Sequence, residues 1–168
     1  QHGGSLKQLQ RLMLSSKAFR LEADGPEHSK AIDEGNHLFW KWNRRRVDFE
    51  SMLDRLLETA GTLNTTTTGG RSVSLDNPAG DPRRSVYAFV DRYALATTFV
   101  SFDLPHPDHH SPSRVETTVP QQALYFLNGP LAIRQAVKLA NDPTFKGLPD
   151  DSAKLKWLYQ RIYQREPA

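Results

Sequence analysis

Two long stretches without hydrophobic periodicity, residues 21–36 and 63–82, constrain the fold more than any other feature of this sequence. Glycine-proline, glycine-glycine and asparagine-proline pairs interrupt them, and such pairs are typical of turns and loops. The helices of a four-helix bundle are joined by much shorter connections, and loops of about 20 residues are usually functional or mobile. The sequence therefore favours a mainly α, loop-rich array with at most one short β pair, and the short strand that we expect lies at residues 73–75.

Apolar residues recur three and four positions apart in about five segments, which predicts amphipathic helices. The first three predicted helices are residues 6–19, a segment that follows Asp48, and residues 94–102. Another begins at a capping sequence at 118–121, is broken or kinked at Asn128-Gly129-Pro130, and is followed by a further apolar stripe at 133–140. The last predicted helix starts at Asp151. No internal repeat is visible.

Several residues mark the ends of these helices. Ser5 and Asp48 stand at N-cap positions, and Val47 with Met52 is spaced for a hydrophobic staple around Asp48. Gly61 stands where a left-handed C-terminal cap is favoured. We expect each end within a few residues of these signals.

The helical stripes also predict which side chains face the core. Thr118-Val119-Pro120-Gln121 reads as a capping box, and a helix follows it. The residues expected to point inward are Leu53, Leu56, Leu57, Ala60, Ala123, Leu124, Leu127, Ile133, Ala136, Val137, Ala140, Leu155, Leu158, Tyr159 and Ile162.

Two segments do not follow this pattern. Residues 83–90 fit either a strand or a buried helical turn, because both faces are apolar, and the pattern leaves the choice open. Residues 105–112 contain three prolines, which lack the backbone donors of a helix or central strand, so this segment is predicted to be a loop.

Composition excludes several classes of function. The chain has 22 basic and 19 acidic residues, and a net charge of +3 makes nucleic acid a disfavoured partner. It has no cysteine, so disulfides, thiolate metal sites, a cysteine nucleophile and a covalent c-type haem attachment are excluded from it. Its apolar runs fall well short of the roughly 20 residues of a membrane span, and no transmembrane segment is expected.

The two ends of the sequence suggest a piece of a longer protein. It starts at Gln1-His2-Gly3-Gly4 without a methionine, and it stops at Ala168 while a helical pattern is still running. We expect residues 1–168 to form a single domain, excised from a longer chain and truncated at both ends.

Arginines at the junctions between elements are the first candidate binding groups. Guanidinium forks suit carboxylate, phosphate or sulfate groups, so these arginines could bind an anionic ligand. The commoner alternative is that they pair with nearby acids and tie loops to helix ends. The candidates are Arg83, Arg84, Arg114, Arg44, Arg45 and Arg46.

Trp40 and Trp42 are a second candidate, because an aromatic pair can either stack on a sugar ring or cover a core. The two rings would share a face in an extended segment and lie on nearly opposite faces of a helix. Covering a hydrophobic core is the more common role of such tryptophans.

A third candidate is a metal site in the loop at 103–110. Its imidazoles and carboxylates are the ligands that zinc or another divalent cation accepts. An exposed loop fixed by prolines is the alternative. The ligands would be Asp103, His106, Asp108, His109 and His110.

Catalytic motifs are absent from the sequence. There is no nucleophile elbow, no His-Glu-x-x-His and no phosphate-binding glycine loop with its lysine. Paired carboxylates for glycoside hydrolysis can be distant in a chain, and Asp103 with Glu116 is the first such pair to inspect.

Several blocks in this order resemble the family called domain of unknown function 1553, the C-terminal domain of large exported proteins of planctomycete-type bacteria. The matching blocks are SLKQL at 5–9, NRRR at 43–46, RRSVY at 83–87, FD at 102–103, TTVPQQAL at 117–124, LNGP at 127–130 and a closing helix at 158–167. The resemblance implies no activity, because the family is defined by sequence.

Members of that family follow cytochrome-c-like domains in one polypeptide. The resemblance therefore implies export to the periplasm or cell surface, upstream domains as partners, and a c-type haem elsewhere in the full-length chain but no cofactor in this fragment. The leading hypothesis is a non-catalytic accessory domain of a secreted multidomain protein that binds an anionic or carbohydrate ligand. The alternative is part of a hydrolase that acts on complex, sulfated polysaccharide, with its site completed by upstream domains.

Overall fold

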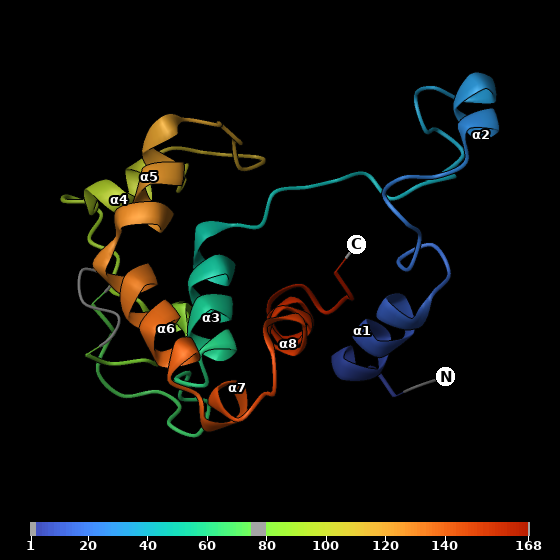
Figure 1. Cartoon of the computed structure of the whole chain (residues 1–168). Coiled ribbons are helices and arrows are strands. Elements are labelled where there is room, and N and C mark those ends of the chain that lie inside the picture. Colours follow the sequence, from blue (N-terminus) through green and yellow to red (C-terminus); the bar gives the residue numbers. More distant parts are fainter. Residues whose placement is uncertain (1–2, 75–79, 168) are drawn as a thin grey trace. The chain divides into compact units, whose positions relative to one another are not determined.

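The computed structural model describes residues 3–74 and 80–167, and these are mainly α-helical (Figure 1). The elements in chain order are α1 (Leu6–Ser15), α2 (Glu27–Ile32), α3 (Phe49–Thr59), the 3-10 turn η1 (Ser85–Tyr87), α4 (Thr97–Ser101), α5 (Pro120–Asn128), α6 (Pro130–Ala140), α7 (Pro143–Lys146) and α8 (Asp151–Tyr163). The predicted fold class, mainly α and rich in loops, is confirmed.

Pairing between extended segments is limited, in the described residues, to two isolated parallel bridges. One joins Asn64 to Arg83 and the other joins Val73 to Ala88. The predicted strand at 73–75 is thus represented by Val73 alone, and Leu75 lies outside the described residues. No helix among the described residues has both the length and the apolar character to cross a membrane.

The chain divides into two compact units, residues 1–46 and residues 47–168. In the first unit, α1 starts at its predicted cap, because the Ser5 hydroxyl accepts a hydrogen bond from the Gln8 amide at 3.4 Å. It ends at Ser15, four residues before the predicted end. The Ser16 hydroxyl donates to the Met13 carbonyl at 2.7 Å and accepts from the Phe19 amide at 3.2 Å, and such local bonds compete with a helix.

Helix α2 corrects the prediction that residues 21–36 form only a loop. It starts directly after Pro26, with Glu27 in its first turn and Lys30 in its last, both favourable to the helix dipole. None of its residues is buried, so it has no apolar stripe that a periodicity search could detect.

The second unit is built around an aromatic and aliphatic core on α3. The buried cluster comprises Phe49, Leu53, Leu57, Phe99, Phe102 and Leu131, and the rings of Phe49 and Phe102 stack at 4.2 Å. Helix α3 packs against α6 and η1, and α5 packs against α6 (Figure 1).

The ends of α3 follow the sequence signals. It begins after Asp48, as predicted, although the Asp48 carboxylate accepts from the Ser51 hydroxyl rather than from a helix amide. Gly61 has φ +68° just beyond the helix, which is the left-handed conformation that a side chain would disfavour. Leu53 and Leu57 are buried as expected.

The segment at 83–90, left open between a strand and a buried helical turn, contains elements of both. Residues 85–87 form η1, and Arg83 and Ala88 on either side each make one bridge. It is not a buried turn throughout, since Val86 is 71% exposed. The predicted loop at 105–112 is confirmed, and the predicted helix at 94–102 shortens to α4.

The predicted core faces of the last three long helices need correction. In α5 and α6 the buried residues are Gln122, Leu131 and Gln135, whereas Leu124, Leu127, Ile133 and Val137 are exposed. In α8, Leu158 and Tyr159 are half-buried, but Leu155 and Ile162 are exposed. The capping box is displaced by one residue, because Val119 is the N-cap and its amide donates to the Gln122 side chain at 3.3 Å.

Candidate functional site

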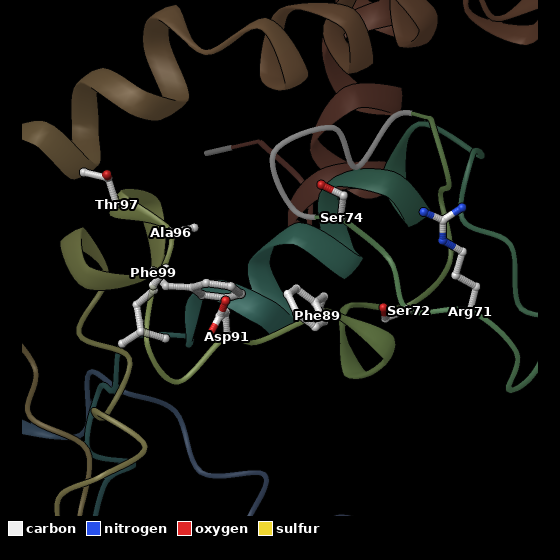
Figure 2. Close-up of a pocket in the computed structure, with 10 residues that line it drawn as sticks. Arg71, Ser72, Ser74, Phe89, Asp91, Ala96, Thr97 and Phe99 are labelled. Atoms are coloured by element: carbon white, nitrogen blue, oxygen red, sulfur yellow. The ribbon is translucent and has the colours of Figure 1, made fainter.

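A polar pocket of about 540 Å³ in the second unit combines charged, hydroxyl and aromatic groups (Figure 2). We call it the Phe89 pocket. It is lined by Arg71, Ser72, Ser74, Phe89, Asp91, Ala94, Leu95, Ala96, Thr97 and Phe99. The segments around Val73 and Phe89 form one side, and α4 with the residues before it forms the other.

On the first side of the pocket, backbone hydrogen bonds align the segment around Val73 with the segment at 87–89. The Val73 amide donates to the Tyr87 carbonyl, and the Phe89 amide donates to the Val73 carbonyl, each at 2.9 Å. Val73 is almost fully buried, and in an extended segment its neighbours point the opposite way. Ser72 and Ser74 consequently line the pocket next to Phe89.

Arg83 holds the chain that carries Arg71. Its guanidinium donates to the carbonyls of Gly69 and Arg71 and to the Asp81 carboxylate, and its side chain is only 6% exposed. The hydrogen bonds from Arg83 lower the pKa of Asp81, and Asp81 in turn raises the pKa of Arg83. Arg83 therefore holds in place the backbone that carries the pocket residue Arg71.

The aromatic ring of Phe89 is the main apolar surface that the pocket offers to solvent, since Phe89 is 61% exposed while Phe99 belongs to the buried core. Asp91 accepts a hydrogen bond from the Tyr93 amide at 2.9 Å, which fixes its carboxylate. Figure 2 shows Phe89 between Arg71 and Asp91.

The arginines predicted as ligand groups are largely engaged by acids of the same unit. Arg84 pairs with Asp54 at 3.1 Å and Arg114 with Glu50 at 2.9 Å, in addition to the Arg83 pair with Asp81. In the first unit, Arg44 pairs with Asp24 at 2.5 Å, Arg45 is exposed, and Arg46 is half-buried. The structure does not gather Arg83, Arg84 and Arg114 in one of the described pockets.

Ser85 and Asp54 form the polar link between η1 and α3. The Ser85 hydroxyl lies 2.5 Å from an Asp54 oxygen and 2.6 Å from the Glu50 carbonyl, and the Ser85 amide also donates to Asp54. Arg114 extends this link by donating to the carbonyls of Phe102 and Asp103. These contacts tie the 83–114 region to α3.

The two predicted tryptophans are both used in packing of the first unit. The Trp40 indole donates to the Asp33 carbonyl at 2.7 Å and leaves no room for a side chain at Gly25. The Trp42 ring lies 5.1 Å from that of Phe19. Asp33 also accepts from the amides of His37 and Leu38, and these bonds lower its pKa.

The predicted metal ligands at 103–110 have other contacts. Asp103 accepts from the amide and the hydroxyl of Thr117, and Asp108 pairs with Arg92. His106 and His109 have ring centres 5.0 Å apart, but the described part of the chain contains no group of three or more His, Asp or Glu placed to hold a metal ion. The metal site at these residues, including His110, stays a prediction.

The hypothesised acid pair also lacks supporting geometry. Both oxygens of Asp103 are occupied by Thr117, and Glu116 is exposed. The chain has no cysteine for the thioether bonds of a c-type haem, and a haem elsewhere in the full-length chain stays a prediction.

A second hollow, of about 490 Å³, lies between α3, α6 and α8 and is mostly apolar. Met52 and Leu56 of α3, Leu139 of α6 and Ile162 of α8 contribute to its walls. Arg161 of α8 donates to the Thr59 carbonyl at 2.9 Å, so α8 is attached at the end of α3. We refer to it as the apolar groove.

Sequence reasoning did not single out the residues of the Phe89 pocket. Two sequence signals concern these residues. The first is the length of the polar stretch at 63–82, which contains Arg71. The second is the apolar character of both faces at 83–90, which gives no indication whether Phe89 faces the core or solvent. Neither signal shows that these segments meet.

The geometry defines a mainly α fold, with a polar pocket beside the core of the second unit. A family model described as protein of unknown function (DUF1553) matches residues 1–168, and the chain belongs to this family. The family predicted from the sequence is thereby confirmed. No curated protein and no solved structure matches the chain.

Proposed function

We propose that this chain is a non-catalytic accessory domain that binds a saccharide in the Phe89 pocket. The exposed Phe89 ring, flanked by hydroxyl groups and a carboxylate, is the observation that carries the proposal. An aromatic face packs against the C–H face of a sugar ring, and the surrounding polar groups can bond to its hydroxyls.

The two hollows of the second unit differ in the chemistry they suit. The apolar groove offers aliphatic side chains with few hydrogen-bonding groups. The Phe89 pocket offers the hydroxyls of Ser72, Ser74 and Thr97 around one ring. A polyhydroxylated ligand needs such hydrogen bonds, since a buried polar group without a partner costs free energy. The Phe89 pocket is thus the better saccharide site.

Binding rather than hydrolysis is proposed because of the acids in the pocket. Most glycosidases use two carboxylic acids that flank the bond they cleave. Among the described residues that line the Phe89 pocket, Asp91 is the one carboxylic acid. This supports an accessory role over the alternative of a hydrolase of complex polysaccharide.

Export and association with other domains complete the proposal. The family resemblance suggests a secreted, multidomain protein, in which upstream domains of the same polypeptide are the partners of this one. The apolar groove supports an interaction role, because apolar hollows at a surface commonly bind other protein segments.

Substitution of Phe89 tests the saccharide proposal. Phe89→Ala removes the stacking surface, and we expect affinity for oligosaccharides in isothermal titration calorimetry to fall about tenfold or more, equivalent to about 1.4 kcal/mol. Val86→Ala is the matched control, because Val86 is exposed in the same segment but does not line the pocket. Unchanged affinity in Phe89→Ala would refute the site, and release of shortened saccharides would refute the non-catalytic role.

A further inference from the structure

The charges of the Phe89 pocket are separated. Among the described residues that line the pocket, Arg71 and Asp91 are the two charged ones, and Figure 2 shows them on opposite sides of Phe89. A ligand that spans the ring would therefore meet a cation at one end and an anion at the other. This arrangement selects for a ligand whose own two ends differ.

Arg71 is placed to receive an anion. Its carbonyl is held by the buried Arg83, which fixes the backbone, while its own side chain is exposed. No carboxylate of the described residues lies within ion-pair distance of the Arg71 guanidinium. This distinguishes Arg71 from Arg83, Arg84 and Arg114, each of which has an acid partner.

Asp91 is placed to receive hydroxyl donors. One of its oxygens accepts the Tyr93 amide, and a carboxylate has further lone pairs that remain able to accept. A negative ligand group at this end would be repelled, because like charges within a few ångströms disfavour each other.

We propose that the ligand of the Phe89 pocket is a uronic-acid oligosaccharide, with a sugar carboxylate on Arg71, a ring face on Phe89 and sugar hydroxyls on Asp91. This rests on the proposed saccharide function and names the class of saccharide. A guanidinium fork matches a carboxylate bidentately with opposite charge, whereas a neutral sugar offers Arg71 only uncharged hydroxyl acceptors. A densely sulfated chain would place anions against Asp91 and bind less well.

A pair of ligands that share their rings and hydroxyls but differ in the charge of the acid groups tests this inference on the whole chain. Tetragalacturonate and its methyl ester have the same rings and hydroxyls, but the ester lacks the carboxylate charges. We expect calorimetry to show the acid binding about tenfold more tightly than the ester. In Arg71→Gln this preference for the acid should disappear.

Arg55→Gln is the control for loss of one positive charge, since Arg55 is exposed and lines the apolar groove instead. It should keep the full preference for the acid. Equal loss of preference in Arg55→Gln and Arg71→Gln would mean a general charge effect and would overturn the inference. A circular dichroism melt of each variant checks that the fold is retained.

The outcomes separate this inference from the proposed function. If wild type binds acid and ester equally and Phe89→Ala weakens both, the saccharide site stands and the uronic-acid assignment is wrong. If wild type binds neither ligand nor any neutral oligosaccharide, the proposed function fails and the inference fails with it. An acid preference that depends on Arg71 supports both.

Discussion

Arg71 and Arg83 show why residue type alone does not identify a ligand-binding group. Arg83 stands in the RRSVY block and looks like a binding residue, yet it is buried and donates to two carbonyls and to Asp81. Arg71 stands in a polar stretch without hydrophobic periodicity, yet it lines the Phe89 pocket. Burial and partners decide between the two roles, and neither can be derived from an arginine's neighbours in sequence.

The bonds between Arg83 and Asp81 predict a pH dependence of stability. Because these bonds lower the pKa of Asp81 from its ordinary value of 3.8, ionised Asp81 stabilises the fold at neutral pH. That stabilisation is present above pH 3.8 and is lost as the pH falls through the lower pKa of the folded state. In Asp81→Asn we expect lower stability at pH 7 and a smaller further loss on acidification.

Urea unfolding midpoints between pH 2 and pH 7 measure this difference. Glu116→Gln serves as the control, because it removes one exposed acid that the structure does not use in a described ion pair. Parallel stability curves for wild type and Asp81→Asn would show that Asp81 has no such role.

The helices illustrate which parts of a fold local patterns can predict. Helix α3 was placed correctly because its cap residues and its leucine stripe agree. The sequence predicts α5 and α6 but not the faces that they bury, because their most apolar faces are exposed in the structure. Their buried glutamines have distant partners: Gln122 donates to the Ser101 carbonyl at 2.8 Å, and Gln135 accepts from the Thr62 hydroxyl at 3.0 Å. A periodicity search treats glutamine as exposed and cannot find partners 21 or 73 residues away.

The junction between α5 and α6 predicts a specific requirement for glycine. Gly129 caps the end of α5 and precedes Pro130, and a Cβ there would lie 2.2 Å from the Tyr125 carbonyl oxygen. We expect Gly129→Ala to destabilise the chain by about 1–3 kcal/mol, the usual cost of overpacking. Thermal unfolding measures this cost. Gly69→Ala is the comparison for backbone strain without a clash, because Gly69 has φ +70°, where alanine is strained, but open space around it. Equal, small effects of both changes would disprove the steric argument.

Site and fold differ in how far the sequence could predict them. Family membership, helical class and the proline loop could all be predicted, because each depends on residues close together in the chain. The Phe89 pocket depends on pairing between Val73 and the segment at 87–89, and on α4 packing next to it. Residues 63–82 have no periodicity from which such pairing could be predicted. The sequence therefore predicts the helical fold but not the residues that line the Phe89 pocket.

The division into two units predicts that residues 47–168 fold without residues 1–46. All six members of the buried cluster, and the link between Ser85 and Asp54, lie within 47–168. The first unit has no fully buried apolar side chain among its described residues, so it contributes little hydrophobic stabilisation of its own. About 120 residues are enough to bury a stable core.

We therefore expect the fragment 47–168 to unfold cooperatively, with a melting temperature within a few degrees of the whole chain. It should also retain the proposed saccharide binding, because the Phe89 pocket lies entirely within it. Residues 1–46 alone should show no cooperative transition. Differential scanning calorimetry and amide NMR dispersion measure both properties. A fragment 47–168 with collapsed dispersion and no heat-absorption peak would mean that its core needs residues 1–46. A folded fragment that lost saccharide affinity would mean that the first unit contributes to the site.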